Sequence, residues 1–110
     1  MNFFKPQACK TIEEFTTLLQ SQLEDYYQHN FPNLEVPKVV IYEGTKFYKI
    51  MTTNNGTWGF ASRKRFIHKG VEVKQGDLMM AAGRQAAKHP RGNIIDGTAC
   101  YGPYGPTYLK

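Results

Sequence analysis

The feature of this sequence that most constrains its fold is a change in the spacing of apolar residues near position 37. From Thr11 to Phe31 the apolar residues recur every three or four positions, as they do along one face of an α-helix. The members of this stripe are Ile12, Phe15, Leu19, Leu23, Tyr26 and Tyr27. Thr11 and Glu14 have the spacing of a capping box, and Pro32 ends the segment. We therefore expect one amphipathic helix within residues 1–33.

From residue 38 onward the apolar residues alternate with polar ones, which is the period of a β-strand. The expected strands are 38–43, 46–52, 58–67 and 71–73, and 77–82 is either a last strand or the start of a helix. Asn55-Gly56 is the dipeptide preferred in tight hairpins, because both residues tolerate a positive φ. Alternation along 58–67 places Trp58, Phe60 and Phe66 on one face. The sequence thus predicts an antiparallel meander over 38–82.

The final segment, 83–110, is rich in glycine, proline and tyrosine, and its glycines and prolines are typical of turns. We expect an ordered but irregular C-terminal arm whose tyrosines fold back onto the core. The chain of 110 residues is the size of one domain. The predicted class is α+β: an N-terminal amphipathic helix packed on a three- to five-stranded antiparallel sheet, followed by this arm.

Charge is unevenly distributed along the chain. Residues 1–37 carry two basic and five acidic side chains, a net charge of −3, and residues 38–110 carry twelve basic and four acidic ones, a net charge of +8. The two parts sum to the total of +5. A surface of this kind attracts polyanions, acidic partners or phosphorylated ligands. The alternative is that the positive charge only keeps a small protein in solution.

Cysteine content and hydropathy bear on the compartment. Cys9 and Cys100 could form one bridge, but they do not make a disulfide framework, which favours a reducing cytoplasm. The chain contains no run of about 18 apolar residues, so we expect no membrane span. The segment before Thr11 lacks the apolar core of a secretory signal.

The residues that could carry chemistry do not form a recognisable catalytic or metal pattern. His29, His68 and His89 lack the spacing of metal ligands. Cys100 and His89 are eleven positions apart and would meet only through folding. A phosphate-binding glycine loop and a hydrolase elbow are both missing from the sequence. We therefore expect neither a cofactor nor a metal, and the sequence favours a protein that is not an enzyme.

A first basic group, Arg63-Lys64-Arg65, lies in the predicted strand 58–67. Alternation would place Arg63 and Arg65 side by side on one face, close to aromatic rings. Two such arginines could hold a backbone phosphate while a base stacks on a ring. They could equally protect an edge strand from aggregation.

A second basic group is the stretch AAKHPRGNIIDG, residues 86–97, where proline and glycine predict a loop. Lys88, His89 and Asn93 could offer donors to a phosphate or carboxylate. We expect Arg91 instead to be a structural clamp that pairs with Asp96 or with the terminal turns, because a glycine- and proline-rich arm needs side-chain partners for its backbone. Asn93 has an alternative role, which is to cap a backbone amide.

The segments GDLMMAAGRQAAKHPRGNIIDG and YGPYGPTYL resemble the C-terminal half of small proteins encoded by bacteriophages. The shared pattern is a Gly-Asp turn leading into a strand, then Ala-Lys-His-x-Arg-Gly-Asn, then Gly-Pro-Tyr-Gly-x-x-Tyr-Leu. The matching positions are Gly76, Asp77, Ala87, Lys88, His89, Arg91, Gly92, Asn93, Gly102, Pro103, Tyr104, Gly105, Tyr108 and Leu109. The resemblance covers residues 40–110 and leaves out the predicted helix. It implies a viral origin and a fold, and no activity is assigned to this group.

These observations predict a non-enzymatic basic binding protein, encoded by a phage, whose anionic partner is most simply nucleic acid. The alternative is a phage protein that binds a host protein or sequesters a nucleotide signal to counter host defence. In the first case Arg63, Arg65, Lys88, His89 and Asn93 would contact the ligand, and affinity would fall steeply with salt. The expected location is the cytoplasm of an infected bacterial host.

Overall fold

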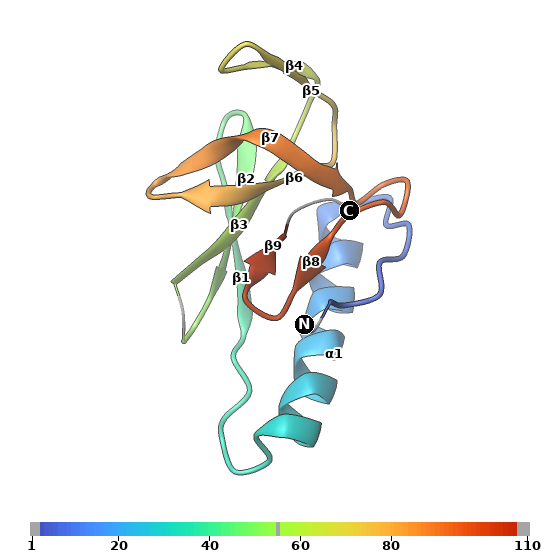
Figure 1. Ribbon diagram of the computed structural model, residues 1–110, viewed down its shortest axis with the longest axis vertical. Coiled ribbons are helices and arrows are strands. Elements are labelled where there is room, and N and C mark those ends of the chain that lie inside the picture. The colour runs from blue at the N-terminus through green and yellow to red at the C-terminus, as the bar shows by residue number, and fades with distance from the viewer. Residues whose placement is uncertain (1–2, 55, 108–110) are drawn as a thin grey trace.

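The computed structural model describes residues 3–54 and 56–107 and shows one helix lying against antiparallel sheets (Figure 1). Helix α1 (Ile12–Asn30) is followed by strands β1 (Val39–Glu43), β2 (Phe47–Thr52), β3 (Gly56–Ser62), β4 (Phe66–His68), β5 (Val71–Val73), β6 (Asp77–Ala82), β7 (Gln85–Asn93), β8 (Tyr101–Gly102) and β9 (Gly105–Pro106). The predicted α+β class is confirmed, and residues 77–82 form a strand. Asn55 of the predicted hairpin lies outside the described residues, and its neighbour Gly56 has a φ of 77°.

Five of the strands form the main sheet, in the order β1-β2-β3-β6-β7, and all neighbours in it are antiparallel. Strands β4 and β5 pair with each other, and so do β8 and β9. The prediction of a continuous strand over 58–67 is wrong, because the chain bends at 63–65 and β4 leaves the main sheet. The β4–β5 hairpin lies at one end of the longest axis, which measures 44 Å against 24 Å for the other two (Figure 1).

Helix α1 begins and ends where the sequence predicts. The backbone N–H of Glu14 donates to the Thr11 hydroxyl at 3.1 Å, while the Glu14 carboxylate accepts from the backbone N–H of Lys10 at 3.1 Å. The carboxylate therefore reaches one residue further back than in a standard capping box. At the other end, the N–H of Phe31 closes the last turn by donating to the carbonyl of Tyr27 at 2.7 Å.

Two apolar cores lie on opposite faces of the main sheet. The larger lies between α1 and the sheet and contains Phe15, Leu19, Leu23, Ile50, Trp58, Leu78 and Tyr101 among its buried members. The smaller lies under the β4–β5 hairpin and is formed by Phe60, Val73, Met79 and Ala86, with Phe47, Phe66 and Ala81 packed against them. Each face of the sheet is thus covered by a different element, and this holds the hairpin on the body.

A bulge in β3 divides its aromatic residues between these cores. The register between β2 and β3 shifts between Ile50 and Met51, so one residue of β3 is extra. Trp58 packs on the helix side, with its ring centroid 6.1 Å from that of Phe15, whereas Phe60 belongs to the smaller core. The expectation that Trp58 and Phe60 share one face is therefore wrong, because a bulge reverses the alternation of side chains.

The C-terminal segment is more regular than expected. Residues 85–93 form β7, an edge strand of the main sheet, and only the part after β7 is built from turns and the small β8–β9 hairpin. Pro90 is compatible with this edge strand because one side of the strand has no partner for a backbone N–H. Tyr101 folds back into the larger core, where its hydroxyl donates to the side chain of Gln22 at 2.8 Å and does not face water as expected. Tyr104 is 65% exposed, and Tyr108 lies outside the described residues. Within the described residues, no helix combines the length and the apolar character needed to span a bilayer.

Candidate nucleic-acid interface

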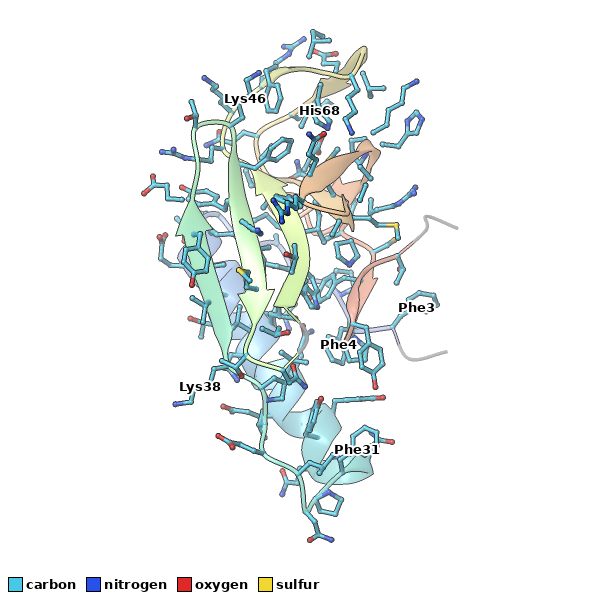
Figure 2. All side chains as sticks on the ribbon, turned by 90° about the vertical axis from the view of Figure 1, so that its left-hand side faces the viewer. Phe3, Phe4, Phe31, Lys38, Lys46 and His68 are labelled. Carbon is cyan, nitrogen blue, oxygen red and sulfur yellow. The ribbon has the colours of Figure 1, made fainter. Side chains whose placement is uncertain are left out.

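Most of the positive charge belongs to one continuous segment of the chain. Residues 63–91 contain eight basic and two acidic side chains, a net charge of +6. This segment forms the β4–β5 and β6–β7 hairpins in the upper part of Figure 1, and we call it, together with Lys46, the basic end. Figure 2 shows Lys46 and His68 at this end, far from Phe31 at the end of α1. The acidic residues Glu24, Asp25 and Glu35 lie on α1 and the loop after it, away from the basic end.

Arg63 is held by groups of the β1–β2 turn. One guanidinium nitrogen lies 2.5 Å from the carboxylate of Glu43, a second donates to the carbonyl of Gly44, and the guanidinium lies 5.3 Å from the ring centroid of Tyr48. The side chain is 33% exposed. Arg63 therefore ties the end of β3 to the neighbouring turn, which sequence alternation could not show.

Arg65 points elsewhere and is much more exposed. Its guanidinium pairs with the carboxylate of Glu72 on β5, and its side chain is 75% exposed. Arg63 and Arg65 do not lie side by side, because the chain bends between β3 and β4. Exposed pairs of this kind contribute about 0–1 kcal/mol, so Arg65 can exchange its carboxylate for another anion at little cost.

The β4–β5 hairpin is preformed and attached to β7. Its turn consists of Lys69 and Gly70, whose φ values of 52° and 83° are those of a type I′ turn. The Nε2 atom of His68 and the Nζ atom of Lys69 lie 3.1 Å and 3.3 Å from the carbonyl oxygen of Ala86. Val73 on β5 is completely buried. The backbone that carries these positive charges is therefore attached to the body of the protein.

The aromatic rings near the basic end are used in packing. The ring centroid of Phe47 lies 5.3 Å from that of Phe66 and 5.2 Å from that of His68, both in edge-to-face contact. The ammonium group of Lys46 lies 5.4 Å from the centroid of Phe66. Trp58 is 3% exposed, so it offers no face to a nucleobase. These rings therefore do not form the open stacking platform beside the arginines that strand alternation predicted.

Lys88 and His89 lie on a bulge of β7. Residues 87–89 of β7 are opposite the single residue Met80 of β6, so two residues of β7 are extra. Both Lys88 and His89 are exposed, on an edge strand rather than in the predicted loop. Bulges redirect side chains away from the regular pleat. The two side chains are thus accessible to a ligand, as the sequence suggested.

Asn93 is buried and fully occupied by contacts within the protein. Its Nδ2 atom donates to the carbonyl of Gln75 at 2.9 Å and to the carboxylate of Asp77 at 2.8 Å. Its Oδ1 atom accepts from the backbone N–H groups of Ile95 at 2.7 Å and Asp96 at 3.3 Å. A side-chain amide has two donor hydrogens and two acceptor positions, and all of them are filled here. The amide therefore caps the loop after β7 and has no position left for a ligand.

Arg91 lies near the end of β7, and Asp96 lies in the turn that follows this strand. Arg91 is half-buried, and its carbonyl accepts from the backbone N–H of Cys100 at 2.8 Å. The carboxylate of Asp96 accepts from the backbone N–H of Thr98 at 3.0 Å and from the hydroxyl of Thr98 at 2.5 Å. Asp96 therefore helps to organise this turn through Thr98, together with the amide of Asn93, and the clamp between Arg91 and Asp96 stays a prediction.

The hollow next to Arg63 is small. It measures about 180 Å³ and is lined by Lys10 and Thr11 at the start of α1, by Ser62 and Arg63 at the end of β3, and by the turn at Gly76.

Both cysteines carry free thiols, and burial raises the pKa of Cys9. The described residues contain no cluster of three or more His, Cys, Asp or Glu side chains that could hold a metal ion.

Sequence reasoning did not single out Ile67, which lies on β4 and is 64% exposed. His68-Lys69-Gly70 is a turn signal in the sequence, and the structure forms the β4–β5 turn there, with Lys69 at its tip. The turn signal did not indicate that Ile67 would face outward. Comparison of this chain with family models, curated proteins and solved structures yields no match.

Proposed function

We propose that this protein is a non-enzymatic nucleic-acid-binding protein and that the basic end is its binding surface. The observation that carries the proposal is the net charge of +6 over residues 63–91, presented by two hairpins with fixed backbones. Among the described residues, no carboxylate forms an ion pair with Lys64, Arg84 or Lys88. Cations that lack a carboxylate partner can neutralise phosphates and release the counterions condensed on nucleic acid, which drives binding.

The distribution of these charges favours a polymer over a small phosphorylated ligand. Lys64 lies in the bend between β3 and β4, Arg84 lies in the β6–β7 turn, and Lys88 lies on the β7 bulge. Pockets for small ligands typically enclose roughly 300–1,000 Å³ and converge a few polar groups on one point. The hollow at Arg63 encloses about 180 Å³, and two larger hollows of about 460 and 430 Å³ lie beside Glu43 and beside Asp25. Lys64, Arg84 and Lys88 line none of these three hollows. A chain of phosphates contacts dispersed charges in a way that a single nucleotide cannot.

The test is a titration of the full chain with a fluorescent duplex and with the matching single strand, over a range of salt concentrations. The double variant Lys64→Gln/Lys88→Gln removes two charges from the basic end, whereas Lys5→Gln/Lys38→Gln removes two exposed charges elsewhere. We expect the first variant to bind more weakly and its salt slope to fall by roughly 2 for a duplex. The second should bind like the wild type. If the wild type binds neither probe at low salt, or if both variants lose affinity equally, the proposal is wrong.

A further inference from the structure

Ile67 is a large apolar side chain held outward at the end of the molecule. It is 64% exposed, while its neighbours Phe66 and His68 face the smaller core and β7. A single exposed apolar residue is common on protein surfaces and needs no explanation by itself. Ile67 differs because it lies at the end of the long axis on a hairpin that is rigid and basic (Figure 1).

The surroundings of Ile67 are cationic. Arg65 comes just before β4 and pairs with Glu72, the residue opposite Ile67 on β5, so its guanidinium lies on the same side of the hairpin as Ile67. The Arg65 side chain is 75% exposed. Lys64 precedes it and Lys69 follows at the turn, and both are exposed. An apolar side chain with positive charges on either side along one ribbon suits a groove edged by phosphates, where the cations contact the backbone and the apolar group reaches the bases.

We infer that the β4–β5 hairpin enters a groove of double-stranded nucleic acid and that Ile67 is an apolar wedge that partly separates two base pairs. The inference rests on the proposed function and specifies the form of nucleic acid and the element that contacts its bases. A two-stranded ribbon fits into a duplex groove, and isoleucine is among the residues that proteins insert between base steps. Binding of single strands instead uses exposed aromatic rings, and the rings beside this hairpin are packed inside.

A wedge has to be backed by rigid structure, because it works against base stacking. The hairpin meets this need through the completely buried Val73 and through the contacts of His68 and Lys69 with the carbonyl of Ala86. Lys69 also adopts a positive φ of 52°, a conformation that a lysine rarely takes. The hairpin is therefore ordered before binding, and little conformational entropy remains to be lost.

Glu72 is an unfavourable group on this face. It lies directly opposite Ile67 in the β4–β5 register and pairs with Arg65. Docking on a duplex would bring this carboxylate close to phosphates, while Arg65 would exchange it for a phosphate oxygen. Glu72→Gln should therefore raise duplex affinity severalfold, because it removes a negative charge and releases the guanidinium. If the pair of Arg65 and Glu72 only stabilised the fold, Glu72→Gln would not raise duplex affinity.

The decisive experiment measures affinity and bending with a duplex of roughly 20 base pairs that carries a donor and an acceptor dye at its ends. Ile67→Ala removes the wedge, and Ile67→Leu keeps an apolar wedge of similar size. Leu34→Ala is the matched control, because Leu34 is 60% exposed and lies in the loop after α1, at the other end of the molecule. A single strand of the same sequence serves as the second probe.

We expect the wild type to shorten the distance between the dyes and Ile67→Ala to abolish this bend and weaken duplex binding roughly tenfold. Ile67→Leu and Leu34→Ala should bend the duplex like the wild type, and single-strand affinity should not change. If Ile67→Ala binds and bends the duplex normally, the inference is wrong while the proposed function stands. An equal loss of affinity for both probes also overturns it, since the side chain would then not act on base pairs. A wild type that binds neither probe overturns both proposals.

Discussion

The side-chain amide of Asn93 donates a hydrogen bond to the buried carboxylate of Asp77 at 2.8 Å and thereby joins β7 to β6. The same carboxylate accepts from the backbone N–H of Lys74 at 2.8 Å, and the backbone N–H of Asp77 donates to the hydroxyl of Ser62 at 3.2 Å. A buried polar network with all its members paired stabilises one arrangement of the backbone. These contacts set the position of the turn before β6 and of the loop after β7.

Asn93→Ala should lower the free energy of unfolding by about 2–4 kcal/mol, because it removes a partner of the buried carboxylate of Asp77 and the acceptor for two backbone N–H groups. Urea denaturation followed by circular dichroism measures this loss. Asn33→Ala, in an exposed turn, should change stability by no more than about 0.5 kcal/mol. Equal stabilities of the two variants would show that the network contributes nothing.

Gly92→Ala should be among the most damaging single changes in the chain. Gly92 has a φ of 85°, and a Cβ atom there would lie 2.0 Å from the backbone oxygen of Thr98. Gly56 has a similar φ of 77°, but its Cβ would meet nothing within 4 Å. Gly56→Ala should therefore cost only the backbone term of about 1–2 kcal/mol, and Gly92→Ala should cost more than that or prevent folding. Thermal melts compare the two variants, and we expect Gly92→Ala to unfold at a clearly lower temperature than Gly56→Ala.

Arg63 and Arg65 should differ in what they do. Arg63→Ala should lower stability by roughly 1–2 kcal/mol, since it loses contacts with Glu43, Gly44 and Tyr48, although partial exposure limits the effect. Arg65→Ala should leave stability within about 0.5 kcal/mol and weaken nucleic-acid binding. Chemical denaturation measures the stability of both variants, and duplex titration measures their affinity. If Arg65→Ala lost stability and Arg63→Ala lost only affinity, the two roles would be assigned the wrong way round.

Substitutions of Arg91 and Lys88 test whether buried side-chain contacts hold the segment after Ala86 in place. Arg91 is half-buried in a region rich in turns, where a guanidinium can satisfy several carbonyl groups at once. Arg91→Ala should therefore lower the free energy of unfolding by roughly 2–4 kcal/mol. Lys88→Ala, at an exposed bulge, should stay within about 0.5 kcal/mol of the wild type and weaken binding. If Arg91→Ala unfolds like the wild type, Arg91 is not a structural clamp.

Tyr101 should make the protein sensitive to alkaline pH. Burial raises the pKa of its hydroxyl from 10.0 to about 12, so the folded protein holds this proton at pH values where the unfolded chain has lost it. The free energy of unfolding should then fall as pH rises from about 10 to about 12, by on the order of 2–3 kcal/mol in total. Tyr101→Phe should lose this component of the pH dependence, which denaturation at pH 9 and at pH 11 measures. An unchanged slope in the variant would assign the effect to other groups.

Local pattern was enough for the helix and for β1, β2, β3, β5 and β6, but not for β4, β7 or the β8–β9 hairpin. The meander predicted over 38–82 is wrong in one respect, because β3 pairs with β6 while β4 and β5 form a separate hairpin. The capping residue Thr11, the apolar stripe and Pro32 set the limits of α1, because capping and helical period are properties of neighbouring residues. The uneven charge along the chain was likewise readable, because it is a sum over side chains. The exposure of Lys88 and His89 followed from the same local reasoning, although the element that carries them was not recognised as a strand.

The sites depended on contacts between distant residues. Arg63 meets Glu43 and Arg65 meets Glu72 only because the chain bends at 63–65, and the bend in turn depends on where β4 and β5 find apolar cover. Asn93 meets Asp77 because the register of β6 and β7 brings them opposite each other. The register between two strands cannot be predicted from the residue pattern of either strand alone.

The sequence by itself determined the class of the fold, the single helix and the excess of positive charge in the second part of the chain. The tertiary structure decided which cations are tied to carboxylates, which face solvent, and that the β4–β5 hairpin carries Ile67 outward at one end. The physical reason is the range of the interactions. Helical period, capping and turn preference act over a few residues, whereas bulges, strand register and burial are settled only when elements far apart in the chain pack together.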